Sequence, residues 1–325
     1  DNNFIIENNA KHLWHPMGAP RDSINNPPKV ITNASGSQIS DIDGHTTVDA
    51  VGGLWCVNLG YSNETVKKAI SEQLNHLPYY SGFAGTTNPA AIEASFMVKE
   101  MFKSDGMEKV FFTSGGSDSV ETCLRLSRQY HRLRGEPTRT KFISLKKGYH
   151  GTHFGGASVN GNNRFRIAYE PLLPGCFHLP SPYTYRNPFN ETDSQKLALN
   201  IAQAFEDEIA FQDKNTIAAF IMEPIQGAGG VIVPDPSFMG LMQEICERNG
   251  ILMISDEVIT GFGRLGCCFA ANRFDVRPDM ITMAKGLTSA MIPMSAVAFD
   301  NSIYDQLMEG PEAMIELFHG YTYSG

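Results

Sequence analysis

Apolar residues in this chain occur both as short continuous runs and as longer stretches with helical spacing. Continuous runs are typical of strands buried on both faces, and spaced stretches are typical of the helices that cover them. Near the start of the chain, the pattern of residues 37–53 predicts a hairpin that turns at Asp43 and Gly44. The pattern as a whole predicts an α/β fold with a mainly parallel, mixed sheet covered by helices on both faces. We expect strands at 109–114, 140–145, 216–222, 251–255 and 280–284, and helices at 118–135, 195–212 and 236–249.

Polar residues gather where the predicted strands end. Ligands of such sheets bind at the carboxyl ends of the strands, and five polar strand ends are more than solvated loops require. We therefore expect these ends to share one site. They are Ser114–Ser117, Tyr149–Gly151, Glu223–Pro224, Asp256–Glu257 and Lys285–Gly286.

The first of these segments, FFTSGGSDSVET (111–122), joins a predicted strand to a predicted helix through two glycines and two serines. Free N–H groups at a helix start make an anion site. A plain capped turn is the alternative interpretation. The segment lacks the spacing of nucleotide-binding motifs, and Ser119 stands where a GxSxG elbow needs glycine. If the segment binds phosphate, a smaller phosphorylated cofactor is indicated.

Two carboxylates, Asp256 and Glu257, follow the buried strand of ILMISDEVITGFGR (251–264). An inward-facing Asp256 without a partner would be costly, so it should meet a cation. A pyridinium nitrogen is such a cation, and the ion pair would help the ring to withdraw electrons. A helix N-cap is the alternative role for Asp256.

The run DMITMAKGLTS (279–289) ends in a lysine, Lys285, where an ammonium ion is costly to bury. The side chain either reaches solvent from the strand end or is kept for imine chemistry, since partial burial favours the nucleophilic free amine. The Gly-rich loop KKGYHGTHFGG (146–156) adds Tyr149, an aromatic ring that could stack on a flat cofactor. His150 and His153 lack a third ligand of suitable spacing, so a metal site is not expected.

An anion cradle, a stacking ring, an inward aspartate and a lysine are the four parts that a pyridoxal 5'-phosphate site requires. In this interpretation Lys285 forms a Schiff base with the cofactor.

Composition limits the other possibilities. The chain has 325 residues, 42% of them hydrophobic and 19% charged, as is ordinary for a globular enzyme. A net charge of -9 disfavours nucleic acid and acidic membranes as partners, although a local basic pocket for a small anion stays possible. No leader or membrane span is evident. The six cysteines show no CxxC pair, which favours reduced thiols in the cytoplasm.

These residues resemble the class III (omega) aminotransferases, which are fold type I pyridoxal-phosphate enzymes. The likeness runs from about Leu13 to Gly325 and is nearest to omega-amino acid and amine:pyruvate transaminases. Six blocks stand in the family's order: FFTSGGSDSVET, GYHGTHFGGAS, MEPIQGAGGVIVP, SDEVITGFGRLG, AKGLTSAMIPMSAV and HGYTYSG.

The resemblance implies roles for particular residues. Lys285 would carry the cofactor and move the proton, and Asp256 would pair with the ring nitrogen. Tyr149 and Val258 would lie on opposite faces of the ring. The cofactor-binding residues implied in all are Gly116, Ser117, Tyr149, His150, Glu223, Asp256, Val258, Lys285 and Thr322.

The resemblance also implies substrates and an assembly. An amine donor would give its amino group to a keto acid, typically pyruvate, in a ping-pong sequence. The pocket walls would be Trp55, Phe83, Tyr149 and Ala228, and an aromatic cage with few charges favours donors such as beta-alanine, taurine, diamines or arylalkylamines. Thr322 would reach the phosphate of the neighbouring subunit in a homodimer.

Some features depart from the family's pattern. Gly115 stands where serine is usual, and Ala290 and Ser295 stand where glycine is usual. The family's C-terminal small domain is absent from the sequence given, so we expect an N-terminal segment at 1–52, as part of the small domain, and a large cofactor-binding domain at 53–325. Two alternatives stay open: another fold type I enzyme (aminomutase, decarboxylase or racemase), or a truncated, non-catalytic cofactor-binding relative.

Overall fold

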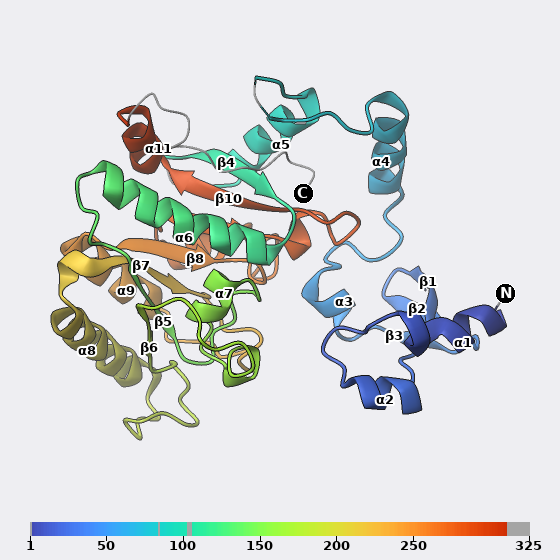
Figure 1. Cartoon of the computed structure of the whole chain (residues 1–325), viewed down its shortest axis with the longest axis horizontal. Helices are drawn as coiled ribbons and strands as arrows, with labels where there is room; N and C mark the ends of the chain where they lie inside the picture. The colour runs from blue at the N-terminus through green and yellow to red at the C-terminus, as the bar shows by residue number, and fades with distance from the viewer. Residues whose placement is uncertain (1, 84, 103–105, 311–325) are drawn as a thin grey trace. The chain divides into compact units, whose positions relative to one another are not determined.

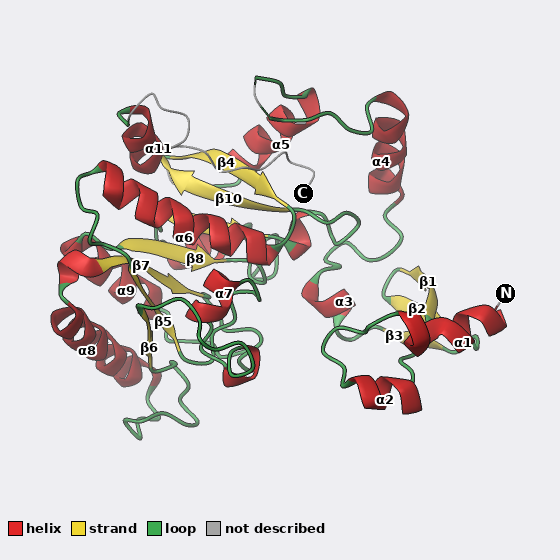
Figure 2. Cartoon of the chain, viewed as in Figure 1, coloured by secondary structure: helices red, strands yellow, loops and turns green. Residues whose placement is uncertain are grey.

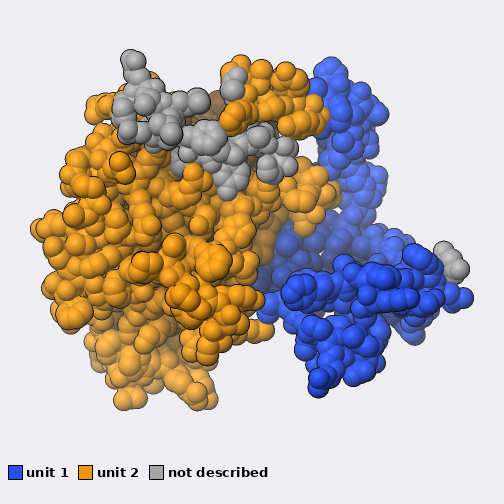
Figure 3. Space-filling view, viewed as in Figure 1, with its two compact units in different colours: residues 1–78 blue, residues 79–325 orange. Residues whose placement is uncertain are grey.

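The computed structural model describes residues 2–83, 85–102 and 106–310. Contacts between residues divide the chain into two compact units, residues 1–78 and 79–325 (Figure 3). We describe each unit by itself. The domain boundary expected after residue 52 stays a prediction.

Unit 1 combines short helices with a small antiparallel sheet. The sheet contains β1 (Ile31–Ser35), β2 (Gln38–Asp41) and β3 (Thr46–Val48) in that order. The hairpin expected at Asp43 and Gly44 joins β2 to β3, and Asp41 Oδ1 accepts hydrogen bonds from the backbone N–H groups of Asp43 and His45. The helices are α1 (Asn2–His12), α2 (Pro20–Asn25), α3 (Gly52–Trp55) and α4 (Glu64–His76).

Unit 2 is built on a seven-stranded sheet with the order β4-β10-β9-β8-β7-β5-β6. Strand β10 (Ser295–Asp300) runs antiparallel to both of its neighbours, and the other strands share one direction. The mainly parallel, mixed sheet expected from the apolar runs is therefore confirmed. The remaining strands are β4 (Met107–Thr113), β5 (Lys141–Leu145), β6 (Cys176–Leu179), β7 (Ile217–Met222), β8 (Leu252–Asp256) and β9 (Met280–Met283).

Helices cover both faces of this sheet (Figures 1 and 2). On one face, α6 (Gly116–Leu133), α7 (Phe154–Val159) and α11 (Asn301–Met308) share a hydrophobic core with Leu252 and Ile254 of β8. On the other, α8 (Ser194–Gln212) and α9 (Phe238–Asn249) share a core with Met253. Successive strand residues point to opposite faces, so a strand buried on both faces must be apolar throughout. Two further helices are α5 (Pro89–Lys99) and α10 (Ala270–Phe274).

All eight predicted elements of unit 2 are present, within a few residues of their expected ends. The sequence analysis did not propose β6 or β10. Strand β6 is short and only half-buried, and β10 follows a glycine- and serine-containing loop instead of a helix. Three short 3₁₀ turns complete the described elements: Asn163–Phe165, Lys214–Thr216 and Lys285–Leu287. No helix among the described residues is long and apolar enough to cross a membrane.

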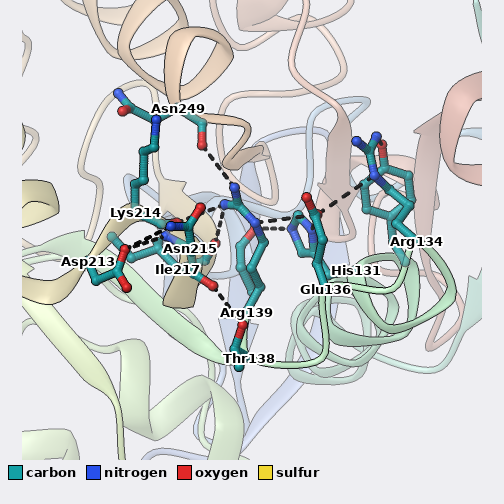
Figure 4. Close-up of polar contacts among 12 residues, drawn as sticks. His131, Arg134, Glu136, Thr138, Arg139, Asp213, Lys214, Asn215, Ile217 and Asn249 are labelled. Atoms are coloured by element: carbon teal, nitrogen blue, oxygen red, sulfur yellow. Dashed lines mark hydrogen bonds and ion pairs between the residues drawn. The ribbon is translucent and has the colours of Figure 1, made fainter.

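A buried arginine, Arg139, lies at the amino ends of β5 and β7, opposite the polar strand ends, and Figure 4 shows its contacts. Arg139 Nη1 donates to the backbone oxygens of Lys214 (2.9 Å) and Ile217 (3.0 Å), and Nη2 donates to that of Asn249 (3.2 Å). Its Nε lies 3.4 Å from a carboxylate oxygen of Glu136. Since Asn249 ends α9, the guanidinium also lies at the negative end of that helix.

We predict that Arg139→Leu lowers the free energy of unfolding by about 3 kcal/mol. The substitution leaves buried carbonyl oxygens without donors and removes the cation beside Glu136. Denaturant unfolding followed by circular dichroism measures the change. Arg132→Leu, at an exposed position on α6, is the matched control and should change stability by less than about 0.5 kcal/mol. Equal stabilities of the two variants would contradict the prediction.

Candidate active site

The carboxyl ends of the strands in unit 2 surround a cavity of about 140 Å³. Eight residues named from the sequence line this cavity, although they come from five separate segments of the chain. Gly151, Ile259 and Ala284 also line it. The eight are Gly116, Ser117, Tyr149, His150, Glu223, Asp256, Val258 and Lys285.

One wall of the cavity is the start of α6. The helix begins at Gly116 after the extended Gly115, two residues earlier than expected, so Gly116 and Ser117 lie in the first turn. Backbone N–H groups of a first turn have no acceptor within the helix, and they form the positive end of its dipole. This wall can therefore bind an anion such as a phosphate group.

Close backbone packing holds this wall against the Tyr149 loop. Ser117 Oγ accepts a hydrogen bond from the N–H of Thr152 at 3.1 Å. Gly151 has a φ of +95°, and a Cβ placed there would lie only 2.6 Å from Ser117 Oγ. A side chain at position 151 would thus both strain the backbone and fill space at the wall.

Ser295 supports the same wall through the residue that precedes α6. Its hydroxyl donates to the carbonyl oxygen of Gly115 at 2.6 Å and also contacts the hydroxyl of Thr113. The serine at 295, noted above as a departure from the family's pattern, thus fixes the residue before the helix start. Ala290, the other departure in the loop after Lys285, has a φ of +61°, which is a conformation that favours glycine.

Asp256, at the end of β8, is buried and both of its carboxylate oxygens are engaged. Oδ2 accepts from His150 Nδ1 at 2.8 Å. Oδ1 accepts from Thr282 Oγ1 at 2.9 Å and from the N–H of Val258 at 3.2 Å. These contacts tie together the ends of β8, β9 and the loop after β5, and they keep the carboxylate at the cavity instead of at a helix N-cap.

His150 is itself fully buried between Asp256 and the protein interior. Because a carboxylate can only accept, Nδ1 is the donor in this pair. Within the part of the chain that the structure describes, the other ring nitrogen, the buried Nε2, has no hydrogen-bond partner. The histidine thus contributes a fixed donor to Asp256, a role that the sequence analysis did not identify.

Glu223, after β7, connects two loops at the cavity. Its Oε1 accepts from the N–H of Tyr149 at 2.8 Å, and its Oε2 accepts from the N–H of Gly227 at 2.9 Å. Burial raises the pKa of the Glu223 carboxyl to about 7. The Tyr149 ring is half-buried and meets Phe165 edge-on, with centroids 4.8 Å apart. Burial, together with Asp256 and Glu223, raises the pKa of the Tyr149 hydroxyl.

Lys285 enters the cavity from a strained turn. It is the first residue of the 3₁₀ turn after β9, and its φ of +43° is unusual for a side chain larger than glycine. Such strain is concentrated at functional sites. The side chain lines the same cavity as Tyr149 and Asp256, which favours the chemical interpretation of this lysine over a lysine directed to solvent.

Glu257 is also buried, whereas the sequence analysis assigned an inward position only to Asp256. Its carboxylate accepts from the N–H groups of Ala270 and Ala271 and from Thr260 Oγ1. Burial raises the pKa of the Glu257 carboxyl to about 7. Its hydrogen bonds to Ala270 and Ala271 hold the two ends of the loop 258–269 together. This loop begins with the two cavity residues Val258 and Ile259.

Among the described residues of unit 2, Phe83 and Ala228 were also named from the sequence, and they do not line this cavity. Trp55 belongs to unit 1. Phe83 and Ala228 belong to unit 2 and are exposed. Thr322 lies outside the described residues. Their roles stay predictions.

Comparisons with known proteins define the family. Residues 20–325 match the sequence model of the aminotransferase class-III family. An omega-aminotransferase of Caulobacter vibrioides is 40% identical over 98% of this chain and 72% of its own length. A putrescine–pyruvate aminotransferase of Pseudomonas aeruginosa is 38% identical over 91% of this chain and 64% of its own length.

Solved structures agree with this assignment. An amine transaminase from an uncultivated Pseudomonas species, solved in its PLP-bound form, has a TM-score of 0.93 and 44% identity, covering 96% of this chain and 70% of its own. An (S)-enantioselective omega-transaminase from Thermomicrobium roseum has a TM-score of 0.94 and 33% identity, covering 99% and 70%. The chain therefore belongs to the class III aminotransferases, which are fold type I enzymes that depend on pyridoxal 5'-phosphate.

The residues at the cavity fit this cofactor. The first turn of α6 offers N–H groups for a phosphate, and the glycine at 151 leaves space beside it. Asp256 is a buried carboxylate whose hydrogen bonds come from neutral donors or from His150, so it can meet a cationic ring nitrogen. Tyr149 offers an aromatic ring, and Lys285 offers an amine.

We predict that Glu257→Gln makes stability less dependent on pH. The folded state keeps the Glu257 proton up to a pKa of about 7, whereas the usual value is 4.5. Between pH 4.5 and about 7 the unfolded state binds fewer protons than the folded state, so the free energy of unfolding falls as the pH rises. One such group contributes up to about 1.4 kcal/mol per pH unit.

Denaturant unfolding across this pH range measures the slope for the wild type and the variant. Glu244→Gln, at an exposed position on α9, controls for loss of a surface carboxylate. Parallel wild-type and Glu257→Gln curves would show that Glu257 does not carry the expected proton.

Proposed function

We propose that this aminotransferase moves an amino group from an omega-amino acid or amine donor to a keto acid, pyruvate, in two half-reactions. The observation that carries the proposal is the convergence of Lys285, Asp256 and Tyr149 with the first turn of α6 on one cavity. The relatives support the choice of substrates, because they include an omega-aminotransferase and a putrescine–pyruvate aminotransferase.

Each residue has a task that follows from its position. The N–H groups of Gly116 and Ser117 hold the phosphate, and the hydrogen bonds of His150 and Thr282 keep Asp256 directed at the ring nitrogen. When bound, pyridoxal phosphate supplies a ring that withdraws electrons from the reacting carbon of the substrate. Nζ of Lys285 accepts a proton from that carbon and returns it. Proton transfer of this kind accelerates a reaction by roughly 10²–10⁴-fold.

The remaining parts of the proposal concern residues around the cavity. Val258 and Tyr149 would hold the two faces of the ring, and Glu223 would lie on the side of the ring hydroxyl. Trp55, Phe83, Tyr149 and Ala228 form the donor pocket. We also propose a homodimer in which Thr322 reaches the phosphate of the neighbouring subunit, with 1–52 as a part of the small domain and 53–325 as the large domain. The six cysteines are free thiols, in keeping with a cytoplasmic location.

A donor panel tests the proposed reaction. The cofactor-loaded protein is incubated with pyruvate and one donor at a time (beta-alanine, taurine, a diamine or an arylalkylamine), and alanine is measured. Alanine formation that depends on the donor supports the transaminase. Consumption of a donor without alanine would instead indicate a decarboxylase, aminomutase or racemase, or an acceptor other than pyruvate. Cofactor binding without turnover would indicate a non-catalytic relative.

We predict that Lys285→Ala loses turnover and the visible absorbance of covalently held cofactor together, because no other described residue at the cavity offers an amine. Absorbance spectra after gel filtration and the alanine assay measure the two effects. Lys196→Ala, an exposed lysine on α8, is the control and should keep both. A Lys285→Ala protein with normal rates would refute the assigned role.

A further inference from the structure

A second cavity of unit 2 is strongly basic. It is a recess of about 560 Å³ that shares no lining residue with the cofactor cavity. None of the residues that line it carries a carboxylate, whereas three carry a permanent positive charge. The lining residues are Lys146, Lys147, Gly161, Asn162, Asn163, Arg166, His178 and Gly229.

Neither lysine has an acidic partner among the described residues. No carboxylate oxygen of these residues lies within 4.0 Å of either ammonium group. Lys147 Nζ instead lies over the ring of Tyr183, 4.9 Å from its centroid. A surface lysine usually extends into solvent or pairs with an acid. An ammonium group that instead lies over an aromatic ring, beside a second lysine, leaves a positive charge that an anion can balance.

The backbone at Lys147 takes a conformation that lysine rarely adopts. Its φ is +67°, although glycine follows at position 148. The N–H of Lys147 donates to the oxygen of Gly161 at 2.8 Å. A Cβ at Gly229 would lie 2.6 Å from the oxygen of Lys147. The loops on both sides thus hold Lys147 in a strained conformation, a feature that is concentrated at binding and catalytic sites.

Arg166 is held in place by neutral groups. Nη1 donates to His178 Nε2 at 2.8 Å and to the oxygen of Asn160 at 3.1 Å. Burial and the neighbouring Arg166 lower the pKa of His178 to about 4, so this imidazole is neutral and accepts. The partner of Nη2 is Glu170, 3.3 Å away and half exposed, and an exposed pair of this kind contributes little. The neutral groups therefore orient the guanidinium in advance, and its acidic partner among the described residues is half exposed.

We propose that this recess binds a phosphate group, either free or as part of a small phosphorylated molecule. Two lysines and one oriented arginine match a group that carries a charge near -2 and three acceptor oxygens. The volume lies within the range of small-molecule sites, about 300–1,000 Å³. The proposal does not concern the phosphate of pyridoxal phosphate, because that group belongs to the first turn of α6.

The position of the recess connects it to the active site. Lys147 is two residues before Tyr149, and the oxygen of Lys146 accepts from Gln226 Nε2 at 2.9 Å. An anion held by both lysines would therefore restrain the loops that carry Tyr149 and Gly227. Binding to the folded state alone should raise the unfolding temperature as the concentration of the anion rises.

The test is calorimetric titration of the cofactor-loaded protein, in a buffer without phosphate, with inorganic phosphate or methyl phosphate. Loading the cofactor fills the α6 cradle, so that heat from that site does not interfere. Sodium chloride at matched ionic strength is a third titrant. We expect saturable binding of at least one phosphate compound, and Lys147→Gln/Arg166→Gln should weaken it by about tenfold or more.

The control variant is Lys196→Gln/Arg21→Gln, which removes two exposed charges elsewhere and should bind as the wild type does. If Lys147→Gln/Arg166→Gln does not fold, Lys146→Gln/Lys147→Gln replaces it, with the visible cofactor spectrum as the check on the fold. Tighter binding of methyl phosphate would assign the recess to a phosphate ester, and tighter binding of inorganic phosphate to the free ion. Undiminished binding by the recess variant, equal heats with chloride, or no binding of either compound would overturn the proposal.

Discussion

The candidate active site depends on one buried carboxylate. Asp256 is placed at the end of an apolar strand, where an unpartnered charge would be costly. Its oxygens are satisfied by His150, Thr282 and the N–H of Val258, so the ends of β8 and β9 and the loop after β5 must keep a fixed spacing. The same spacing brings Tyr149 and Lys285 to one cavity. Satisfying this charge and assembling the cofactor site are thus one structural requirement.

The sequence predicted the parts of the fold that follow from local pattern. Runs such as 217–222 and 251–254 are apolar at every position because both faces of the sheet are covered, and this pattern distinguishes them from strands with one solvent-exposed face. It also predicted which strand ends meet, since ligands of parallel sheets bind at one edge. The family motifs then named the residues that line the cavity.

What the sequence did not predict depends on contacts between distant segments. Nothing in the pattern near Glu257 indicates that its carboxylate accepts from Ala270 and Ala271, because that contact requires the loop 258–269 to fold back. The hydrogen bond of His150 to Asp256 and the hydroxyl of Ser295 are similar cases. Strand β10 was missed because it follows a loop instead of a helix, and its antiparallel pairing with β4 and β9 depends on segments far away in the sequence.

The hydroxyl of Ser295 connects two separate parts of the chain at the cavity. Strand β10 begins directly after the loop that starts at Lys285, and its first residue contacts Gly115 beside the phosphate cradle. The loop that starts at Lys285 is therefore linked to the residue before the first turn of α6 through one small, buried side chain. A substitution at position 295 would alter the support of the proposed phosphate site without changing any residue that lines the cavity.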